Sequence, residues 1–107
     1  MMNQQLLEIL QKLNLYMQEI YAERLYSLIL FGSQARGDAD LDSDIDVLVV
    51  LRDDVDSWTE IKRTGGFISQ LCLENSILIS NIFVSAKQFT EQNTALLRNI
   101  KREGIAI

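Results

Sequence analysis

The chain has 107 residues, 48% of them apolar, and its 10 basic and 15 acidic side chains give a formal net charge of −5. A chain of this length builds one domain, expected here over residues 1–107, and leaves no room for a second domain with its own substrate pocket. The acidic balance argues against direct binding of nucleic acid, because such binding needs a basic surface that displaces counterions from phosphates.

Histidine is absent and cysteine occurs once, as Cys72. Histidine-based catalysis, an intrachain disulfide and a zinc site of histidine or thiolate ligands are therefore excluded. If the protein uses a metal, oxygen ligands must hold it, and Mg²⁺ is the default hard cation. No apolar run is long enough to span a bilayer, and the first residues lack the features of a secretory signal, so we expect a cytoplasmic protein.

The predicted elements alternate between helices and strands. Apolar residues three and four apart predict a helix over residues 4–26. Three short apolar runs predict buried strands over residues 26–31, 45–51 and 77–84, and a short helical turn is predicted over residues 33–39. Two further helices are predicted over residues 57–74 and 86–102, and residues 105–107 are predicted to add a short edge strand.

This order of elements predicts an α/β (α+β) domain, with a small mixed sheet flanked by helices and a topology that the residues leave open. The helix predicted over residues 57–74 carries apolar residues that we expect to face inward: Trp58, Ile61, Ile68, Leu71 and Cys72. Trp58 could instead anchor a partner protein, and the sequence does not decide between these two roles. The Gly65-Gly66 pair should weaken or bend this helix by roughly 1 kcal/mol per glycine.

The most informative stretch begins at Gly32-Ser33, where the first predicted strand ends. Glycine lets a phosphate approach the backbone, and the unpaired N–H groups at a helix start offer donors to an anion. The hydroxyl of Ser33 adds a donor, and the planar guanidinium of Arg36 lies about one turn further on. This half of the stretch predicts phosphate binding.

The second half places Asp44 and Asp46 two residues apart at the start of a strand. Side chains alternate along a strand, so we expect both carboxylates on one side, with Ile45 and Val47 pointing into the core. A divalent cation relieves the repulsion between two adjacent carboxylates, and Mg²⁺ commonly uses one or two carboxylates together with substrate phosphates.

Each feature has a simpler interpretation when it stands alone. A Gly-Ser pair after a strand is usually a turn, an Asp-x-Asp pair is usually solvated, and Arg36 alone is a surface charge. Their occurrence in this order favours a site for phosphoryl or nucleotidyl transfer, because that chemistry depends mostly on positioning and charge neutralisation.

The motif Gly32-Ser33, Arg36-Gly37 and Ser43-Asp44-Ile45-Asp46 resembles the signature of the DNA polymerase β-like nucleotidyltransferase superfamily. More narrowly, the chain is similar to the minimal nucleotidyltransferases of bacteria and archaea. The predicted first helix and residues 97–105 are also similar to that family, so the resemblance covers nearly the whole chain.

The resemblance implies a nucleotidyltransferase fold and a site that binds a nucleoside triphosphate with Mg²⁺. The implied nucleotide-binding residues are Gly32, Ser33, Arg36 and Ser43, and the implied catalytic metal ligands are Asp44 and Asp46. Many such proteins are antitoxins paired with a HEPN-domain ribonuclease toxin, and several silence that toxin by transferring AMP to it. We therefore expect transfer of AMP from MgATP to a hydroxyl of a HEPN partner. The alternative is a weak or inactive nucleotide-binding antitoxin that acts by contact alone.

The sequence departs from the family at one position. Active members carry a third carboxylate on a later strand, whereas the corresponding strand here, residues 77–84, has no acid. Ser80 or Asn81 occupies that position, and both offer neutral oxygens that are poor bases at neutral pH. The nucleotide, the acceptor residue and the formation of a homo-oligomer stay open at this point.

Overall fold

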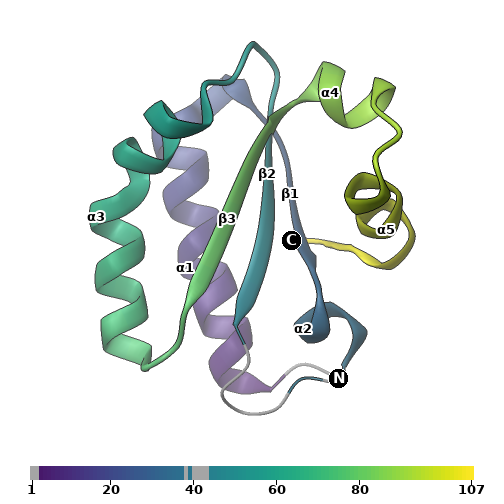
Figure 1. Ribbon diagram of the computed structural model, residues 1–107. Helices are drawn as coiled ribbons and strands as arrows, with labels where there is room; N and C mark the ends of the chain where they lie inside the picture. The colour runs from purple at the N-terminus through teal and green to yellow at the C-terminus, as the bar shows by residue number, and fades with distance from the viewer. Residues whose placement is uncertain (1–2, 38, 40–43) are drawn as a thin grey trace.

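The computed structural model describes residues 3–37, 39 and 44–107 (Figure 1). In chain order, its elements are α1 (Gln4–Tyr21), the 3-10 turn η1 (Ala22–Arg24), β1 (Leu25–Phe31), α2 (Ser33–Arg36), β2 (Ile45–Leu51), α3 (Ser57–Asn75), β3 (Ile79–Ser85), α4 (Ala86–Glu91), α5 (Ala95–Glu103) and β4 (Ile105–Ala106). None of the described helices combines the length and the apolar character needed to cross a bilayer.

The strands form one sheet in the order β3-β2-β1-β4. β1 is antiparallel to both of its neighbours, whereas β2 and β3 are parallel. The predicted mixed sheet is therefore confirmed, and so are the strand over residues 45–51 and the short edge strand after Gly104.

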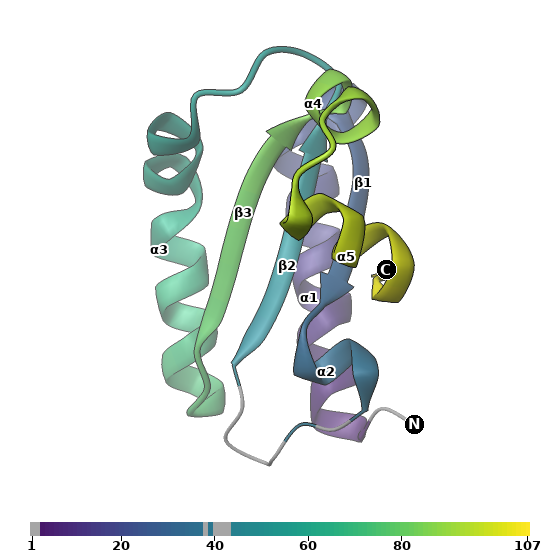
Figure 2. The ribbon, with the colours of Figure 1, turned by 45° about the vertical axis from the view of Figure 1, so that its right-hand side comes forward.

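Helices cover both faces of the sheet, α1 and α3 on one face and α4 and α5 on the other (Figures 1 and 2). β2 lies inside the sheet and contributes to both apolar layers, because Ile45 and Val47 pack on the α1 side and Leu48 and Val50 pack on the α5 side. The predicted inward orientation of Ile45 and Val47 is thus confirmed. A run of apolar residues without alternation is typical of a strand that is buried on both faces.

The first helix is shorter than the spacing of apolar residues predicted. Asn3 begins α1 by accepting a hydrogen bond from the backbone N–H of Leu6 at 2.7 Å, which satisfies a free donor at the helix start. The helix ends at Tyr21 because Ala22 adopts a positive φ of 48°, and the chain then turns into β1. The α-helix therefore does not continue to residue 26 as predicted: residues 22–24 form the 3-10 turn η1, and β1 begins at Leu25.

The predicted helix over residues 86–102 is divided into α4 and α5. Its apolar spacing continues across the break, but Thr94 caps a new helix by accepting a hydrogen bond from the N–H of Leu97 at 3.2 Å. A threonine cap of this kind starts a helix rather than extending one. The new direction lets Leu97 and Ile100 pack against Leu48 and Val50.

α3 is continuous through Gly65 and Gly66, but its buried face differs from the prediction. Leu71 is buried as expected, whereas Trp58 and Ile61 are 65% and 45% exposed, so their predicted inward orientation was wrong. The polar residues Glu60 and Thr64 are buried instead, with exposures of 3% and 2%. This face of α3 turns inward because the Glu60 carboxylate accepts hydrogen bonds from Tyr21 and Arg63.

Candidate functional site

The strand ends that carry Gly32, Asp46 and Ser80 meet at one end of the sheet. The register pairs Phe31, the last residue of β1, with Asp46 near the start of β2. It also pairs Asp46 with Ser80 near the start of β3. Because β1 runs opposite to β2 and β3, the end of β1 and the starts of the other two strands lie at the same end of the sheet (Figure 2).

Gly32 brings the backbone directly against one of the two carboxylates. Its φ of 76° and ψ of −157° lie in a region that is essentially restricted to glycine. A Cβ atom at this position would stand 2.6 Å from Oδ2 of Asp46, so no other residue fits without displacing that side chain. The glycine turn and the carboxylate of Asp46 therefore lie against each other in the structure.

Asp46 is half-buried, and Asp44 lies exposed just before the strand. Burial raises the pKa of the Asp46 carboxyl, and the negative charge of Asp44 raises it further. Among the described residues, no hydrogen bond contributes to this shift, and no three carboxylate, histidine or cysteine side chains are placed so that they could hold a metal ion. Two carboxylates without a basic neighbour fit Mg²⁺, which takes its remaining ligands from phosphates and water.

The strand register distinguishes the two candidates for the third position. Ser80 is the partner of Asp46, so its exposed side chain lies on the same face of the sheet. Asn81 pairs with Val47, and its side chain therefore lies on the opposite face, toward α1 and α3. The Oδ1 atom of Asn81 is buried without a hydrogen-bond partner in the described structure. Ser80 is the residue that can face a ligand held by Asp46.

The remaining predicted residues lie on or beside α2, which follows Gly32 directly. Ser33 begins α2, and Arg36 ends it with an exposed side chain. The guanidinium of Arg36 contacts Glu103 at the end of α5, with Nη1 3.4 Å from Oε2. Ser43 lies outside the described residues. The sequence pointed to residues 97–105 only by their likeness to the family, and it did not indicate that Glu103 contacts Arg36 across 67 residues.

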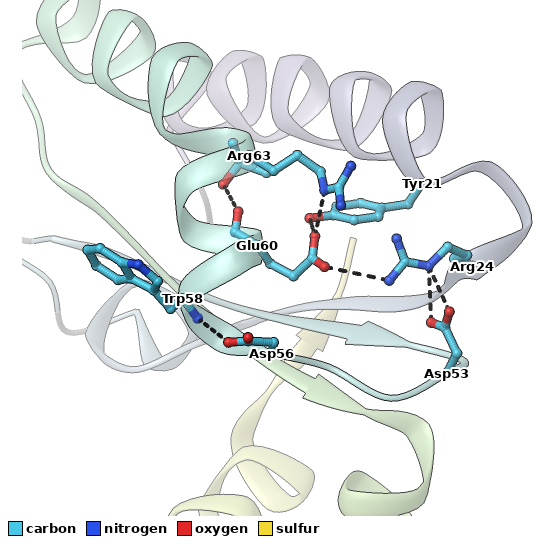
Figure 3. Close-up of polar contacts among 8 residues, drawn as sticks. Tyr21, Arg24, Asp53, Asp56, Trp58, Glu60 and Arg63 are labelled. Carbon is cyan, nitrogen blue, oxygen red and sulfur yellow. Dashed lines mark hydrogen bonds and ion pairs between the residues drawn. The ribbon is translucent and has the colours of Figure 1, made fainter.

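A second carboxylate cluster lies at the opposite end of the sheet (Figure 3). The buried Glu60 accepts a hydrogen bond from the hydroxyl of Tyr21 at 2.7 Å and another from Nε of Arg63 at 2.9 Å. Arg24 stands 3.6 Å from the other oxygen of Glu60 and also pairs with Asp53 at 3.0 Å. Because Tyr21, Arg24 and Arg63 surround the Glu60 carboxylate, its charge is balanced without a metal ion.

A glycine turn that lies against one of two neighbouring aspartates, in a mixed sheet covered by helices, is an arrangement suited to phosphoryl or nucleotidyl transfer. A family model described as "Nucleotidyltransferase domain" matches residues 5–105. The chain therefore belongs to the nucleotidyltransferase domain family.

Two relatives come from Methanocaldococcus jannaschii, and both carry the name "putative protein adenylyltransferase". The first is 35% identical over 85 residues, which cover 78% of this chain and 79% of the relative. The second is 35% identical over 78 residues, which cover 73% of this chain and 78% of the relative. Each match includes more than two thirds of both chains.

Solved structures share the fold at low sequence identity. A "putative nucleotidyltransferase" from Sulfolobus solfataricus has a TM-score of 0.64 at 19% identity, and the match covers 94% of this chain and 77% of that one. A chain from a mutant of the toxin-antitoxin pair MntA-HpeT has a TM-score of 0.60 at 18% identity, with 91% and 70% covered. A chain from a toxin-antitoxin crystal structure with AMP-PNP has a TM-score of 0.60 at 19% identity, with 90% and 70% covered.

Proposed function

We propose that the chain transfers AMP from MgATP to a hydroxyl group of a partner protein, and that the partner is the HEPN-domain toxin of a toxin-antitoxin pair in the cytoplasm. One observation of the site carries the proposal: in a chain of the nucleotidyltransferase domain family, the carboxylate of Asp46 lies against the glycine turn at Gly32. The names of the two relatives support protein as the acceptor.

In this proposal the two sides of the site have different tasks. Gly32 lets the Asp46 carboxylate lie against the backbone where β1 leads into α2, and Ser33 and Arg36 offer donors to the phosphate oxygens. Asp44 and Asp46 would hold Mg²⁺, which when bound neutralises charge on the phosphates during transfer. Ser43, beside Asp44 in the sequence, is assigned to nucleotide binding because of its place in the motif.

The reaction joins the acceptor hydroxyl oxygen to the α-phosphorus of ATP. The bond between that phosphorus and the bridging oxygen of the β-phosphate breaks, so pyrophosphate leaves and the hydroxyl proton passes to solvent. Gly32, Ser33 and Arg36 would hold the triphosphate while the acceptor hydroxyl approaches its α-phosphorus. The proposed source of the acceptor hydroxyl is the partner protein, as the names of the two relatives suggest.

An antitoxin that acts by contact alone is the second candidate. It is favoured by Ser80, which lies beside Asp46 where active family members are expected to carry a third acid. A serine at this place offers a neutral oxygen to a metal but cannot take a proton at neutral pH. This candidate predicts that a folded variant with Asp44→Ala and Asp46→Ala still neutralises the toxin.

The test is the intact mass of the co-purifying partner protein before and after incubation with this chain, Mg²⁺ and each nucleoside triphosphate in turn. The proposal predicts a gain of one or more AMP groups with ATP, and no gain with the Asp44→Ala variant. Asp54→Ala is the matched control, because Asp54 is an exposed aspartate in the loop at the other end of β2. An unchanged mass, together with a stable complex and an inhibited partner, would favour the contact-only antitoxin.

A further inference from the structure

The contact between Arg36 and Glu103 joins two helices that meet beside the candidate site. Arg36 is the last residue of α2, and Glu103 is the last residue of α5. Their side chains are partly exposed, and the 3.4 Å separation of Nη1 and Oε2 is long for an ion pair. A weak contact of this kind can orient the Arg36 guanidinium and still break when a more strongly charged anion, such as a phosphate, binds.

The end of α5 is fixed firmly to the sheet. A Cβ atom at Gly104 would lie 2.5 Å from both the carbonyl oxygen of Ile100 and Cγ2 of Ile29, so the chain at this glycine lies directly on β1. β4 then pairs with β1 at Ile29 and Leu30, immediately before the strand leads to Gly32. Glu103 therefore lies next to residues that pack directly on β1, the strand that also leads to the glycine turn at Gly32.

Glu103 has a second cationic neighbour. Nη2 of Arg102 stands 3.5 Å from Oε1, whereas Arg36 contacts Oε2, so each carboxylate oxygen faces one arginine. Arg102 is also held by Oδ1 of Asn99 at 3.0 Å. If Arg36 swings toward a phosphate, the charge of Glu103 keeps a partner.

We propose that Glu103 is a positioning residue for Arg36: it holds the guanidinium beside the glycine turn and yields it to the triphosphate of the bound nucleotide. This inference rests on the proposed nucleotide binding. It assigns a role to an acid on the last helix, far from the motif in sequence. Because the carboxylate orders Arg36 before the nucleotide arrives, less conformational entropy is lost when the phosphate binds.

The experiment is a double-mutant cycle on the binding of ATP with Mg²⁺, measured by calorimetry on the full chain. Arg36→Ala is expected to weaken binding at least tenfold, because it removes a direct phosphate contact. Glu103→Ala is expected to weaken it about two- to fivefold, the range that partly exposed ion pairs give. The double variant should bind no more weakly than Arg36→Ala alone, since Glu103 acts only through Arg36.

Two further variants separate positioning from a general effect of charge or stability. Glu103→Gln keeps an acceptor oxygen at the same reach and should recover most of the affinity. Glu91→Ala removes an exposed acid from the end of α4 and should leave the affinity unchanged. In the transfer reaction, Glu103→Ala should raise KM for ATP while kcat stays within about twofold, and thermal unfolding shows which variants remain folded.

The outcomes distinguish this inference from the function on which it rests. Unchanged or tighter binding by a folded Glu103→Ala variant would overturn the positioning role, and so would a loss that adds fully to that of Arg36→Ala. If the wild-type chain binds none of the four common nucleoside triphosphates with Mg²⁺, the proposed function fails first and the inference fails with it.

Discussion

The two ends of the sheet treat their carboxylates in opposite ways. At one end, Glu60 is 3% exposed and is surrounded by the donors of Tyr21, Arg24 and Arg63 (Figure 3). At the other end, Asp46 is half-buried beside a second acid, and among the described residues no hydrogen bond contributes to the raised pKa of its carboxyl. Groups of the same chain balance the charge of Glu60, whereas the charge of Asp46 is left for the proposed Mg²⁺ to balance.

This difference shows how a structural carboxylate can be told apart from a binding one. A buried carboxylate that stabilises a fold needs its charge compensated by groups of the same chain, as at Glu60. A carboxylate whose pKa is raised by burial and by the charge of a neighbouring acid, as at Asp46, costs stability in the free protein and is a candidate for a binding role. The predictions that follow test this contrast.

The largest effect is expected on the transfer reaction. Asp46→Asn keeps the shape of the side chain but removes the charge that would hold Mg²⁺, so the transfer rate should fall about a thousandfold. The rate is measured as AMP incorporated into the partner protein at saturating ATP. Asp54→Asn should keep the wild-type rate, and an equal loss in both variants would contradict the assigned site.

Glu60→Ala should reduce the free energy of unfolding by about 3 kcal/mol, because it leaves the buried Tyr21 hydroxyl without its acceptor and Arg24 and Arg63 without their shared partner. Urea unfolding followed by circular dichroism measures this loss. Glu74→Ala, an exposed acid on the same helix, should change the unfolding free energy by less than about 0.5 kcal/mol. A loss below that limit at Glu60 would show that its network contributes little.

Gly32→Ala affects both stability and binding. The new Cβ would stand 2.6 Å from Oδ2 of Asp46 in a backbone conformation that alanine avoids, so we expect a loss of about 2 kcal/mol in unfolding free energy. The displaced carboxylate should also weaken ATP binding. Gly37→Ala is the control, because Gly37 has a positive φ of 81° but nothing within 4 Å of the added Cβ, so it should lose stability without losing affinity.

Tyr21→Phe removes one hydrogen bond from the Glu60 cluster and keeps the aromatic ring in the core. The unfolding free energy should fall by about 1 kcal/mol, and the transfer rate should stay unchanged. Chemical denaturation and the transfer assay measure the two quantities on the same preparation. A large loss of transfer in this variant would mean that the two ends of the sheet are coupled.

The smallest effect concerns the pH dependence of stability. Because the pKa of Asp46 is raised in the folded state above its ordinary value of 3.8, the folded protein binds more protons around that pH and loses stability as pH rises through this range. Asp46→Asn should therefore unfold at a higher temperature than the wild type at pH 7. The difference should vanish below about pH 4, and Mg²⁺ should reduce it at pH 7 by stabilising only the wild type. A lower unfolding temperature for the variant at pH 7 would contradict the raised pKa.

Local patterns in the sequence predicted the parts of the fold that depend on local physics. Residues 45–51, which are apolar except for Asp46, gave the limits of β2 correctly, because a strand buried on both faces is apolar along nearly its whole length. The break between α4 and α5 was missed because the apolar spacing continues across it, although the cap at Thr94 was a usable signal.

Features that depend on pairing between distant residues could not be predicted. The buried position of Glu60 depends on Tyr21, 39 residues earlier, and it turned α3 so that Trp58 became exposed. The choice between Ser80 and Asn81 depends on the register of β3 against β2, where a shift of one residue exchanges the two faces. The motif brought Gly32 and Asp46 to attention, but only the fold places one against the other.

The central claim is that the carboxylates beside Gly32 perform transfer and that the opposite end of the sheet does not. The direct measurement is the passage of label to the partner protein from ATP labelled at the α-phosphorus, with wild type, Asp46→Asn and Tyr21→Phe assayed side by side. The account predicts labelled partner with wild type and Tyr21→Phe and none with Asp46→Asn. Equal labelling by all three chains, or none by a wild type that binds its partner, would contradict it.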